Sequence, residues 1–240
     1  MSFWYQDVPW DVGGENLANW VDFLKHNGSS HANLTHHISG QVELELLKTI
    51  PNNLSWAIHL SSKTLGNASL REFITTCTRL PTFRELLVIS GNPKPKRTSL
   101  ELLQELSHIP YSFPIAVAAS PKDSDEVLAL KLRNPTVQRV YLQLAEPEQW
   151  EPLAARIHAF RTTIFISACW LPPTISNWRA LTLFPWSGSV LSEDWKLSLK
   201  YAEECAQRQL DWMRANNVTP LIEPRRITAA LIDTMRTYHW

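Results

Sequence analysis

Three short, largely apolar segments separated by helical patterns decide the fold: ELLVI at residues 85–89, PIAVA at 114–118 and VQRVYLQ at 137–143. The residues between them include two helix-forming stretches, 99–106 and 124–132. Strands that alternate with helices in this way are typical of βα units, and a strand buried on both faces is apolar along most of its length. This part of the chain therefore predicts a parallel sheet covered by helices.

The same alternation extends over the whole chain. The expected strands are residues 2–5, 32–36, 55–60, 85–89, 114–118, 137–143, 163–168 and 218–222. The expected helices are residues 16–26, 42–50, 69–79, 99–106, 124–132, 148–160, 193–216 and 227–237. Eight strands, each followed by a helix, predict an α/β protein with one domain over residues 1–240, a single compact (β/α)8 barrel of the TIM type.

Two of the helices carry a clear start signal. Ser69 is followed by Glu72, and Thr98 is followed by Glu101. In this spacing each side chain can bond to the backbone N–H of the other residue, which forms a capping box. The pattern predicts that these helices begin directly after Ser69 and Thr98.

The composition excludes several classes of function. Lys and Arg number 23, as do Asp and Glu, so the net charge is zero and a general nucleic-acid binder is not expected. None of the 7 glycines forms a phosphate-binding or nucleophile-elbow motif, which argues against standard Rossmann, P-loop and hydrolase sites. Three separated cysteines, with no signal peptide or long apolar run, predict a cytoplasmic protein without membrane spans.

A TIM-type barrel carries its chemistry at the carboxyl ends of its strands. Several segments at these ends have motifs in a familiar order: AIHLS at residues 57–61, LVISGNP at 87–93, IAVAASPK at 115–122, YLQL at 141–144 and ISACWLP at 166–172. They are similar to P-H-L-T, L-R-G-D-x-P, V-A-A-Y-P-E, T-Q-F-F and I-P-G-I-x-P of the methylenetetrahydrofolate reductase family. The chain therefore resembles a diverged, shortened member of this flavin-bearing barrel family over roughly half its length.

The resemblance implies a function in one-carbon metabolism and methionine biosynthesis. A bound FAD would transfer hydride to a one-carbon-substituted tetrahydrofolate, with NAD(P)H as a possible electron donor. The implied partners are a folate-type small molecule and either a second copy of the chain or a redox partner protein. The implied catalytic residues are Gln143 and Asn92, and the implied substrate-binding residues are Trp4 and Gln143. The implied cofactor-binding residues are His59, Ser61, Ser90, Gly91, Asn92, Ala118, Ser120, Asp125 and Lys131.

The chain also departs from the family pattern at chemically important positions. Trp4 stands where the family keeps a general-acid Glu, and Ser90 and Asn92 replace an Arg and an Asp. Ser120 replaces the Tyr that stacks on the flavin, and Lys122 replaces a Glu. Three hypotheses follow: a reductase with relocated acid–base chemistry, a non-catalytic barrel that binds a folate, a pterin or a protein, and a subunit that needs a redox partner.

Most of these side chains also have a purely structural interpretation. His59 and Gln143 could be satisfied core residues, and Asp125 and Lys131 could be ordinary surface charges of a helix. A metal site that uses the histidines at positions 31, 36 and 37 is not expected, because no adjacent carboxylate completes a ligand set.

Overall fold

The strands of the computed structural model form a closed barrel. The structure describes residues 5–9, 13–26, 29–35, 52, 54–65, 69–90, 96–183, 188–222 and 233. The described strands are β1 (Tyr5–Pro9), β2 (His31–Thr35), β3 (Ser55–Leu60), β4 (Phe83–Val88), β5 (Ile115–Ala119), β6 (Val137–Leu142), β7 (Phe165–Trp170) and β8 (Thr219–Ile222). Neighbours in sequence pair in parallel, and β1 also pairs with β8, which closes the sheet. The α/β class and the parallel sheet are therefore confirmed.

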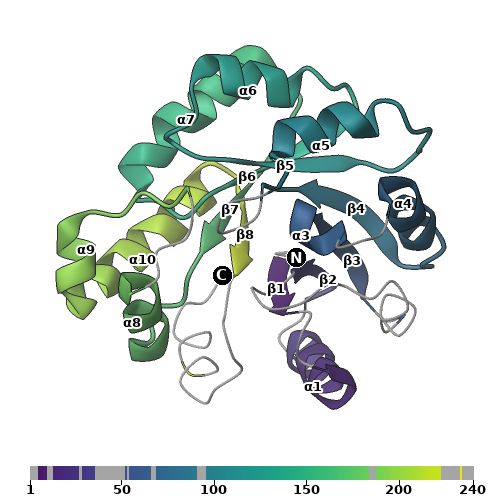
Figure 1. Cartoon of the computed structure of the whole chain (residues 1–240). Coiled ribbons are helices and arrows are strands. Elements are labelled where there is room, and N and C mark those ends of the chain that lie inside the picture. Colours follow the sequence, from purple (N-terminus) through teal and green to yellow (C-terminus); the bar gives the residue numbers. More distant parts are fainter. Residues whose placement is uncertain are drawn as a thin grey trace.

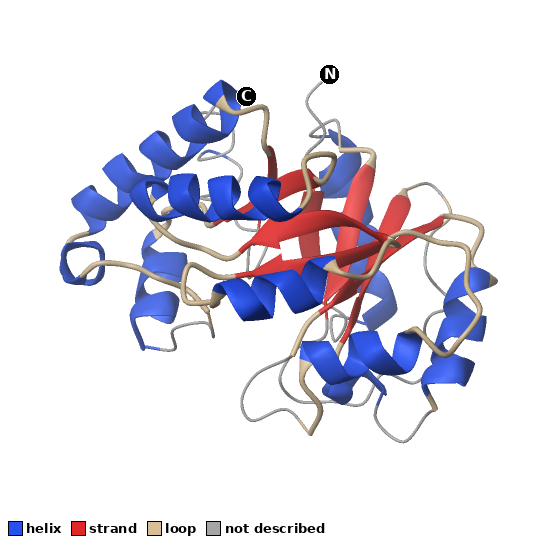
Figure 2. Ribbon diagram, turned by 90° about the horizontal axis from the view of Figure 1, so that it is seen from above, coloured by secondary structure: helices blue, strands red, loops and turns tan. Residues whose placement is uncertain are grey.

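Helices lie around the outside of this barrel (Figure 1). They are α1 (Gly13–His26), α3 (Ser62–Leu65), α4 (Leu70–Thr78), α5 (Ser99–Leu106), α6 (Asp125–Leu132), α7 (Pro147–Phe160), α8 (Ile175–Leu183), α9 (Glu193–Leu197) and α10 (Leu199–Ala215). Figure 2 shows the strands as a central group with helices on their flanks. The predicted helices at 42–50 and 227–237 lie outside the described residues, so the eightfold helix count stays a prediction.

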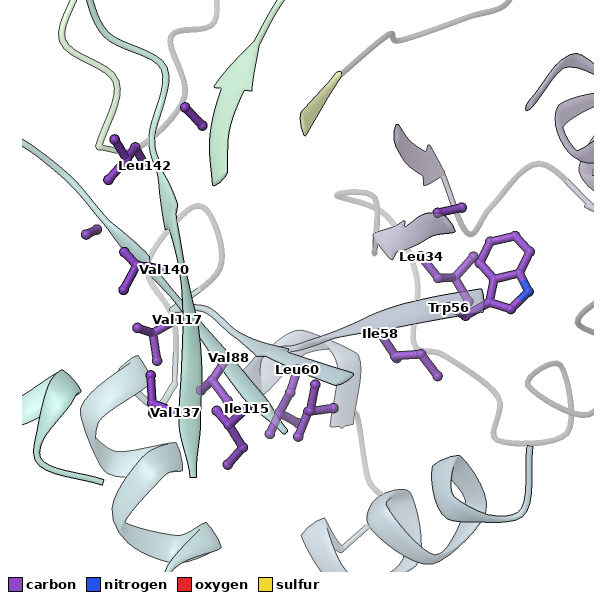
Figure 3. Packing of buried hydrophobic residues seen from close by; sticks show 14 of the residues in the cluster. Leu34, Trp56, Ile58, Leu60, Val88, Ile115, Val117, Val137, Val140 and Leu142 are labelled. Carbon is purple, nitrogen blue, oxygen red and sulfur yellow. The ribbon is translucent and has the colours of Figure 1, made fainter. Parts of the chain in front are cut away.

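Alternate strand residues face the helices and form the larger core. In Figure 3, Ile58 and Leu60 extend from one side of β3, and Val117 and Val140 extend from the corresponding sides of β5 and β6. These side chains belong to one buried cluster that also contains residues of the surrounding helices: Phe73, Leu102, Trp150 and Leu210. The near-continuous apolar strands are thus explained, because one face of each strand packs on helices and the other lines the barrel.

The interior of the barrel is more polar than the layer under the helices. Leu87, Ala116, Tyr141 and Leu221 belong to a second buried cluster. The buried polar side chains that alternate with the outward-facing positions of the strands are Asn33, His59, Glu85 and Ser167. A buried polar group is destabilising unless it finds a partner, so these residues mark the places where the interior has a specific arrangement.

The predicted helix starts are confirmed. Ser69 N donates to Glu72 Oε2 at 2.9 Å, and Glu72 N donates to Ser69 Oγ at 3.2 Å. Thr98 and Glu101 make the equivalent pair of bonds, at 2.6 and 3.3 Å. Each box satisfies N–H groups that the first turn of a helix leaves unpaired.

Several boundaries differ from the prediction. The first described strand is Tyr5–Pro9, whereas the prediction placed this strand at 2–5, of which 2–4 lie outside the described residues; Asp7 lies at the centre of Tyr5–Pro9, in register with Asn33. The long helix expected at 193–216 is interrupted at Ser198, whose extended backbone (φ −132°, ψ 115°) ends α9 while its hydroxyl caps α10 by accepting from Tyr201 N. Helices α3 and α8 were not predicted. No helix in the described part of the chain combines the length and apolar character needed to cross a membrane.

Candidate functional site

The candidate site is the carboxyl end of the barrel, where the resemblance placed its residues. His59 lies inside β3, and Gln143 directly follows β6. Ser61 follows β3, Ser90 follows β4, and Ser120 follows β5. Trp4, Gly91 and Asn92 lie outside the described residues, so the roles that the resemblance assigns to them stay predictions.

His59 is buried in the barrel interior and is held beside Asn33. His59 is 5% exposed, and Asn33 is fully buried. Asn33 Nδ2 lies 3.5 Å from His59 Nε2. Burial lowers the pKa of His59 from 6.5 to about 3, because the imidazolium loses its hydration inside the barrel. His59 is therefore a neutral hydrogen-bonding group at physiological pH.

Lys131 is occupied by contacts within the chain. Its Nζ donates to Asp123 Oδ2 at 2.6 Å and to the carbonyl of Ala118 at 2.8 Å. The same carboxylate oxygen accepts from Ser120 N at 3.0 Å. The lysine and aspartate side chains are only 10% and 18% exposed. This ion pair joins α6 to the end of β5, and it uses the charge that the resemblance assigns to a cofactor.

Asp125 is also paired, on the outer surface of the barrel. Arg156 Nε donates to Asp125 Oδ1 at 2.7 Å, and its Nη2 donates to the carbonyl of Asp123 at 2.6 Å. The Asp125 side chain is 72% exposed, in contrast to Lys131. The two charged residues of the predicted cofactor helix thus hold α6 to β5 and α7.

A strap formed by residues 188–192 covers the ends of β5 and β6. Ser120 Oγ donates to the carbonyl of Gly188 at 2.7 Å, and Val190 N donates to the carbonyl of Leu144 at 2.9 Å. At its end, Ser192 N donates to Glu146 Oε1 at 2.9 Å. Serine at position 120 therefore fastens this strap, where the resembling family has an aromatic residue that stacks on flavin.

Gly188 allows the strap to approach Gln143 closely. Its φ of +87° lies in the region that glycine adopts readily, and a Cβ added there would lie 3.4 Å from Gln143 Cγ. Trp150 Nε1 donates to the carbonyl of Gln143 at 2.9 Å and fixes the backbone of this residue. Within the described part of the chain, the Gln143 amide has no hydrogen-bond partner. It is half-buried and remains able to donate to and accept from a ligand.

Ser90 has a structural role that limits its use as a binding residue. Its Oγ accepts from Ser99 N at 3.0 Å and lies 3.2 Å from Ser99 Oγ. These bonds hold the first turn of α5 against the end of β4. Ser61 is buried at the end of β3, 3% exposed.

The interior toward the amino ends of the strands holds a buried polar cluster that the sequence analysis missed. Tyr141 OH donates to Glu85 Oε1 at 2.6 Å, and Arg139 donates to Glu85 Oε2 at 3.4 Å and to Ser167 Oγ at 3.0 Å. A signal was available, since Glu85 and Arg139 are charged residues inside otherwise largely apolar strand segments, at 83–88 and 137–142. Residues at the amino ends of the strands of a TIM-type barrel usually contribute to stability and not to catalysis.

Within the described residues no group of three His, Cys, Asp or Glu side chains is placed to hold a metal ion. The pKa of His31 is lowered from 6.5 to about 4, mainly by burial and further by the charges of Arg84 and Arg139. The positive charges of Arg84 and Arg139 disfavour the binding of a further cation at His31.

No protein-family model and no curated protein matches this chain. Solved structures do match. The coenzyme F420-dependent tetrahydromethanopterin reductase from Methanopyrus kandleri gives a TM-score of 0.64 at 9% identity, over 99% of this chain and 97% of the other.

A second similar structure is an uncharacterized protein from Clostridium thermocellum that binds two copies of 5-methyl-5,6,7,8-tetrahydrofolic acid. Its TM-score is 0.63 at 10% identity, over 98% of this chain and 93% of the other. Tryptophan synthase from M. tuberculosis gives 0.52 at 13% identity, over 86% and 88%. At such identities the similarity concerns the fold alone, and that fold is shared over almost the whole chain with a tetrahydromethanopterin reductase and a tetrahydrofolate-binding protein.

Proposed function

We propose that this chain is a (β/α)8 barrel that binds a reduced folate or a related pterin at the carboxyl end of its strands. His59 and Gln143 are the side chains that contact the ligand in this proposal. The observation that carries it is the state of these two groups: His59 is neutral and buried, and the half-buried Gln143 amide has no hydrogen-bond partner among the residues that the structure describes. A pterin ring is flat, uncharged at neutral pH and edged by donors and acceptors, which suits such a site.

The two structures with the higher TM-scores support this choice of ligand class. One acts on tetrahydromethanopterin and the other binds 5-methyl-tetrahydrofolic acid. Both cover more than nine-tenths of this chain, whereas the tryptophan synthase similarity is weaker and less complete.

The resemblance implies a bound FAD, but the residues present do not fit this cofactor. Lys131 and Asp125 are each paired with a side chain of the same chain, and Ser120 fastens the strap over β5 and β6. A dinucleotide tail would have to displace these bonds at a cost in binding free energy. We therefore expect a ligand to bind at the carboxyl end of the barrel without a flavin beside α6.

Calorimetric titration with 5-methyl-tetrahydrofolate tests the proposal. We expect the wild-type chain to bind it, and His59→Gln to bind it about fivefold more weakly, as expected for the loss of one neutral hydrogen bond. The matched control is His158→Gln, which changes an exposed histidine of α7 and should leave the affinity unchanged. Absence of binding by a folded wild-type chain would overturn the proposal.

A second candidate is the flavin-dependent reduction of a one-carbon-substituted tetrahydrofolate with NAD(P)H as electron donor. The similarity to a reductase and the order of the strand-end motifs favour it. An absorption spectrum after incubation with FAD or FMN separates the candidates, because only the second requires a yellow, flavin-loaded protein. A cytoplasmic location, a homo-oligomer and a redox partner protein stay predictions.

A further inference from the structure

The amino ends of β4, β5, β6 and β7 form a surface that the proposed ligand site does not use. This amino-end face consists of residues 79–84, 107–114, 133–139 and 161–165, which precede or begin the four strands. The strands are neighbours in the closed sheet, so the four segments lie next to one another at one end of the barrel. A TIM-type barrel carries its chemistry at the other end, so a role of this face is independent of the proposed function.

Contacts between the segments make the amino-end face continuous. The ring centroids of Phe83 and Phe113 lie 5.0 Å apart, which joins the first two segments. Tyr111 OH lies 2.8 Å from Thr136 Oγ1, which joins the second segment to the third. Arg161 donates to two backbone carbonyls of the third segment, at 3.1 and 2.9 Å. The four loops therefore form one fixed surface.

This face is positively charged and has no acidic residue of its own. It contains no Asp, Glu or Lys, and its arginines are Arg79, Arg84, Arg133, Arg139 and Arg161. The carboxylates closest to it in sequence are paired: Glu85 lies 3.4 Å from Arg139, and Glu105 lies 2.7 Å from Arg97. The pKa of His31, at the start of β2, is lowered to about 4, mainly by burial and further by the charges of Arg84 and Arg139. The arginines thus produce a positive potential at this end of the barrel.

Two of the arginines are placed to meet a partner. Arg79 and Arg133 are exposed, and neither forms an ion pair within the described part of the chain. Each is the C-cap residue of a helix, α4 or α6, where a cation interacts favourably with the helix dipole. Lysine would serve the dipole as well as arginine, whereas protein interfaces are enriched in arginine and depleted in lysine. The exclusive use of arginine therefore favours a binding role.

Aromatic side chains are exposed beside these charges. Phe165 is 64% exposed, and Phe160, at the end of α7, is 45% exposed. The guanidinium carbon of Arg139 lies 5.6 Å from the centre of the Phe165 ring. Aromatic and arginine side chains are the groups that contribute most binding energy in protein interfaces. The combination suits a partner that presents apolar side chains together with negative charge.

We propose that the amino-end face is a docking surface for a partner protein that presents carboxylates interspersed with apolar side chains. The planar guanidinium group of arginine matches a carboxylate with two parallel hydrogen bonds. A second copy of the chain related by a two-fold axis would place arginines against arginines, which is repulsive. The zero net charge of the chain argues against a nucleic acid as the partner.

Fluorescence anisotropy with three labelled probes tests this proposal on the full chain. The first is a synthetic peptide that alternates glutamate with leucine, the second has glutamine in place of glutamate, and the third is single-stranded DNA. We expect saturable binding of the glutamate peptide that weakens as the ionic strength rises, and no binding of the glutamine peptide. Absence of binding of the glutamate peptide to the folded chain, or tighter binding of the DNA, would overturn the proposal.

Substitutions on the face locate the binding. Arg79→Glu and Arg133→Glu should each weaken binding of the glutamate peptide about tenfold, because an attraction is replaced by a repulsion. Phe165→Ser should weaken it by a similar factor, about tenfold, through the loss of apolar contact. The matched control is Lys200→Glu, which makes the same change of charge at an 85% exposed position. Lys200 lies in the first turn of α10, where Tyr201 contacts Glu146 beside the strap at the carboxyl end, so the affinity should stay unchanged.

A purely structural role of the arginines gives a different result. If Arg133→Glu lowers Tm but binds the glutamate peptide as tightly as Lys200→Glu does, the arginine serves only the dipole of α6 and the proposal fails. Circular dichroism of each variant shows whether it is folded. Because the face is remote from His59 and Gln143, the affinity for 5-methyl-tetrahydrofolate provides a separate readout that these substitutions should leave unchanged.

Discussion

Replacing Lys131 with methionine should destabilise the protein without removing a ligand contact. The Lys131 ammonium lies 2.6 Å from Asp123 Oδ2 and 2.8 Å from the carbonyl of Ala118, and both charged side chains are largely buried. The substitution leaves the Asp123 carboxylate with the backbone N–H of Ser120 as its partner at 3.0 Å. Breaking a buried ion pair from one side costs ~3 kcal/mol, which corresponds to a fall of roughly 6–12 °C in Tm for a chain of this size.

Thermal unfolding followed by circular dichroism measures this effect. The control is Lys200→Met, since Lys200 is 85% exposed and lies 3.8 Å from Glu204. An exposed pair of this kind contributes ~0–1 kcal/mol, so the control should unfold near the wild-type temperature. Adding Asp123→Asn to Lys131→Met removes the unpaired carboxylate charge and should recover part of the lost Tm.

The opposite pattern would refute the reasoning. If Lys131→Met unfolds at the wild-type temperature but loses the ability to bind a flavin or a folate, then Lys131 is a binding residue. The ion pair with Asp123 would then be incidental to the stability of the barrel.

Three further changes have definite expected outcomes. Because the pKa of His59 is about 3 when folded and 6.5 when unfolded, the unfolded chain binds more protons between these values, and stability should fall as pH decreases through that window. The slope is up to ~1.4 kcal/mol per pH unit, and urea unfolding of His59→Gln should show a shallower slope; an equal slope would contradict the shift. Tyr141→Phe removes the donor to Glu85 and should lower the free energy of unfolding by ~2 kcal/mol; an unchanged urea midpoint would contradict this. Gly188→Ala forces an alanine to φ +87° beside Gln143, which costs ~1–2 kcal/mol of conformational energy. The Val190 amide of the strap, which donates to the Leu144 carbonyl, should therefore exchange faster with solvent. Unchanged exchange would show that the strap tolerates a side chain at this position.

The middle of the fold could be predicted from the sequence because local signals there agree. The strand at residues 55–60 and the helix at 99–106 match β3 and α5 at both ends. Two capping boxes fixed helix starts, and apolar runs fixed strands buried on both faces. The prediction for the first strand followed the aromatic run of Phe3, Trp4 and Tyr5, whereas the described strand also includes Gln6, Asp7 and Pro9. Tertiary pairing with β2 and β8 outweighs local preference there.

The candidate site was predictable only in part. Strand-end topology predicted where His59 and Gln143 lie, since their positions depend on the ends of single strands, and their functional roles stay predictions. The pairing of Lys131 with Asp123 depends on how the loop after β5 turns. The strap is held by the bond between Ser120 and Gly188, which lie 68 residues apart in sequence. Asn33 was missed because its partner is on another strand, and no pattern within β2 reports the register. Contacts of this kind come from the closed sheet and not from local sequence.

The most direct test of the account is a crystal structure of the chain with 5-methyl-tetrahydrofolate. The account predicts electron density for the pterin ring at the carboxyl end of the barrel, within hydrogen-bond distance of His59 and Gln143. It also predicts that the bonds from Lys131 to Asp123 and from Ser120 to Gly188 remain intact. Density for the ligand beside α6 with these bonds broken, or no bound ligand at saturating concentration, would contradict it.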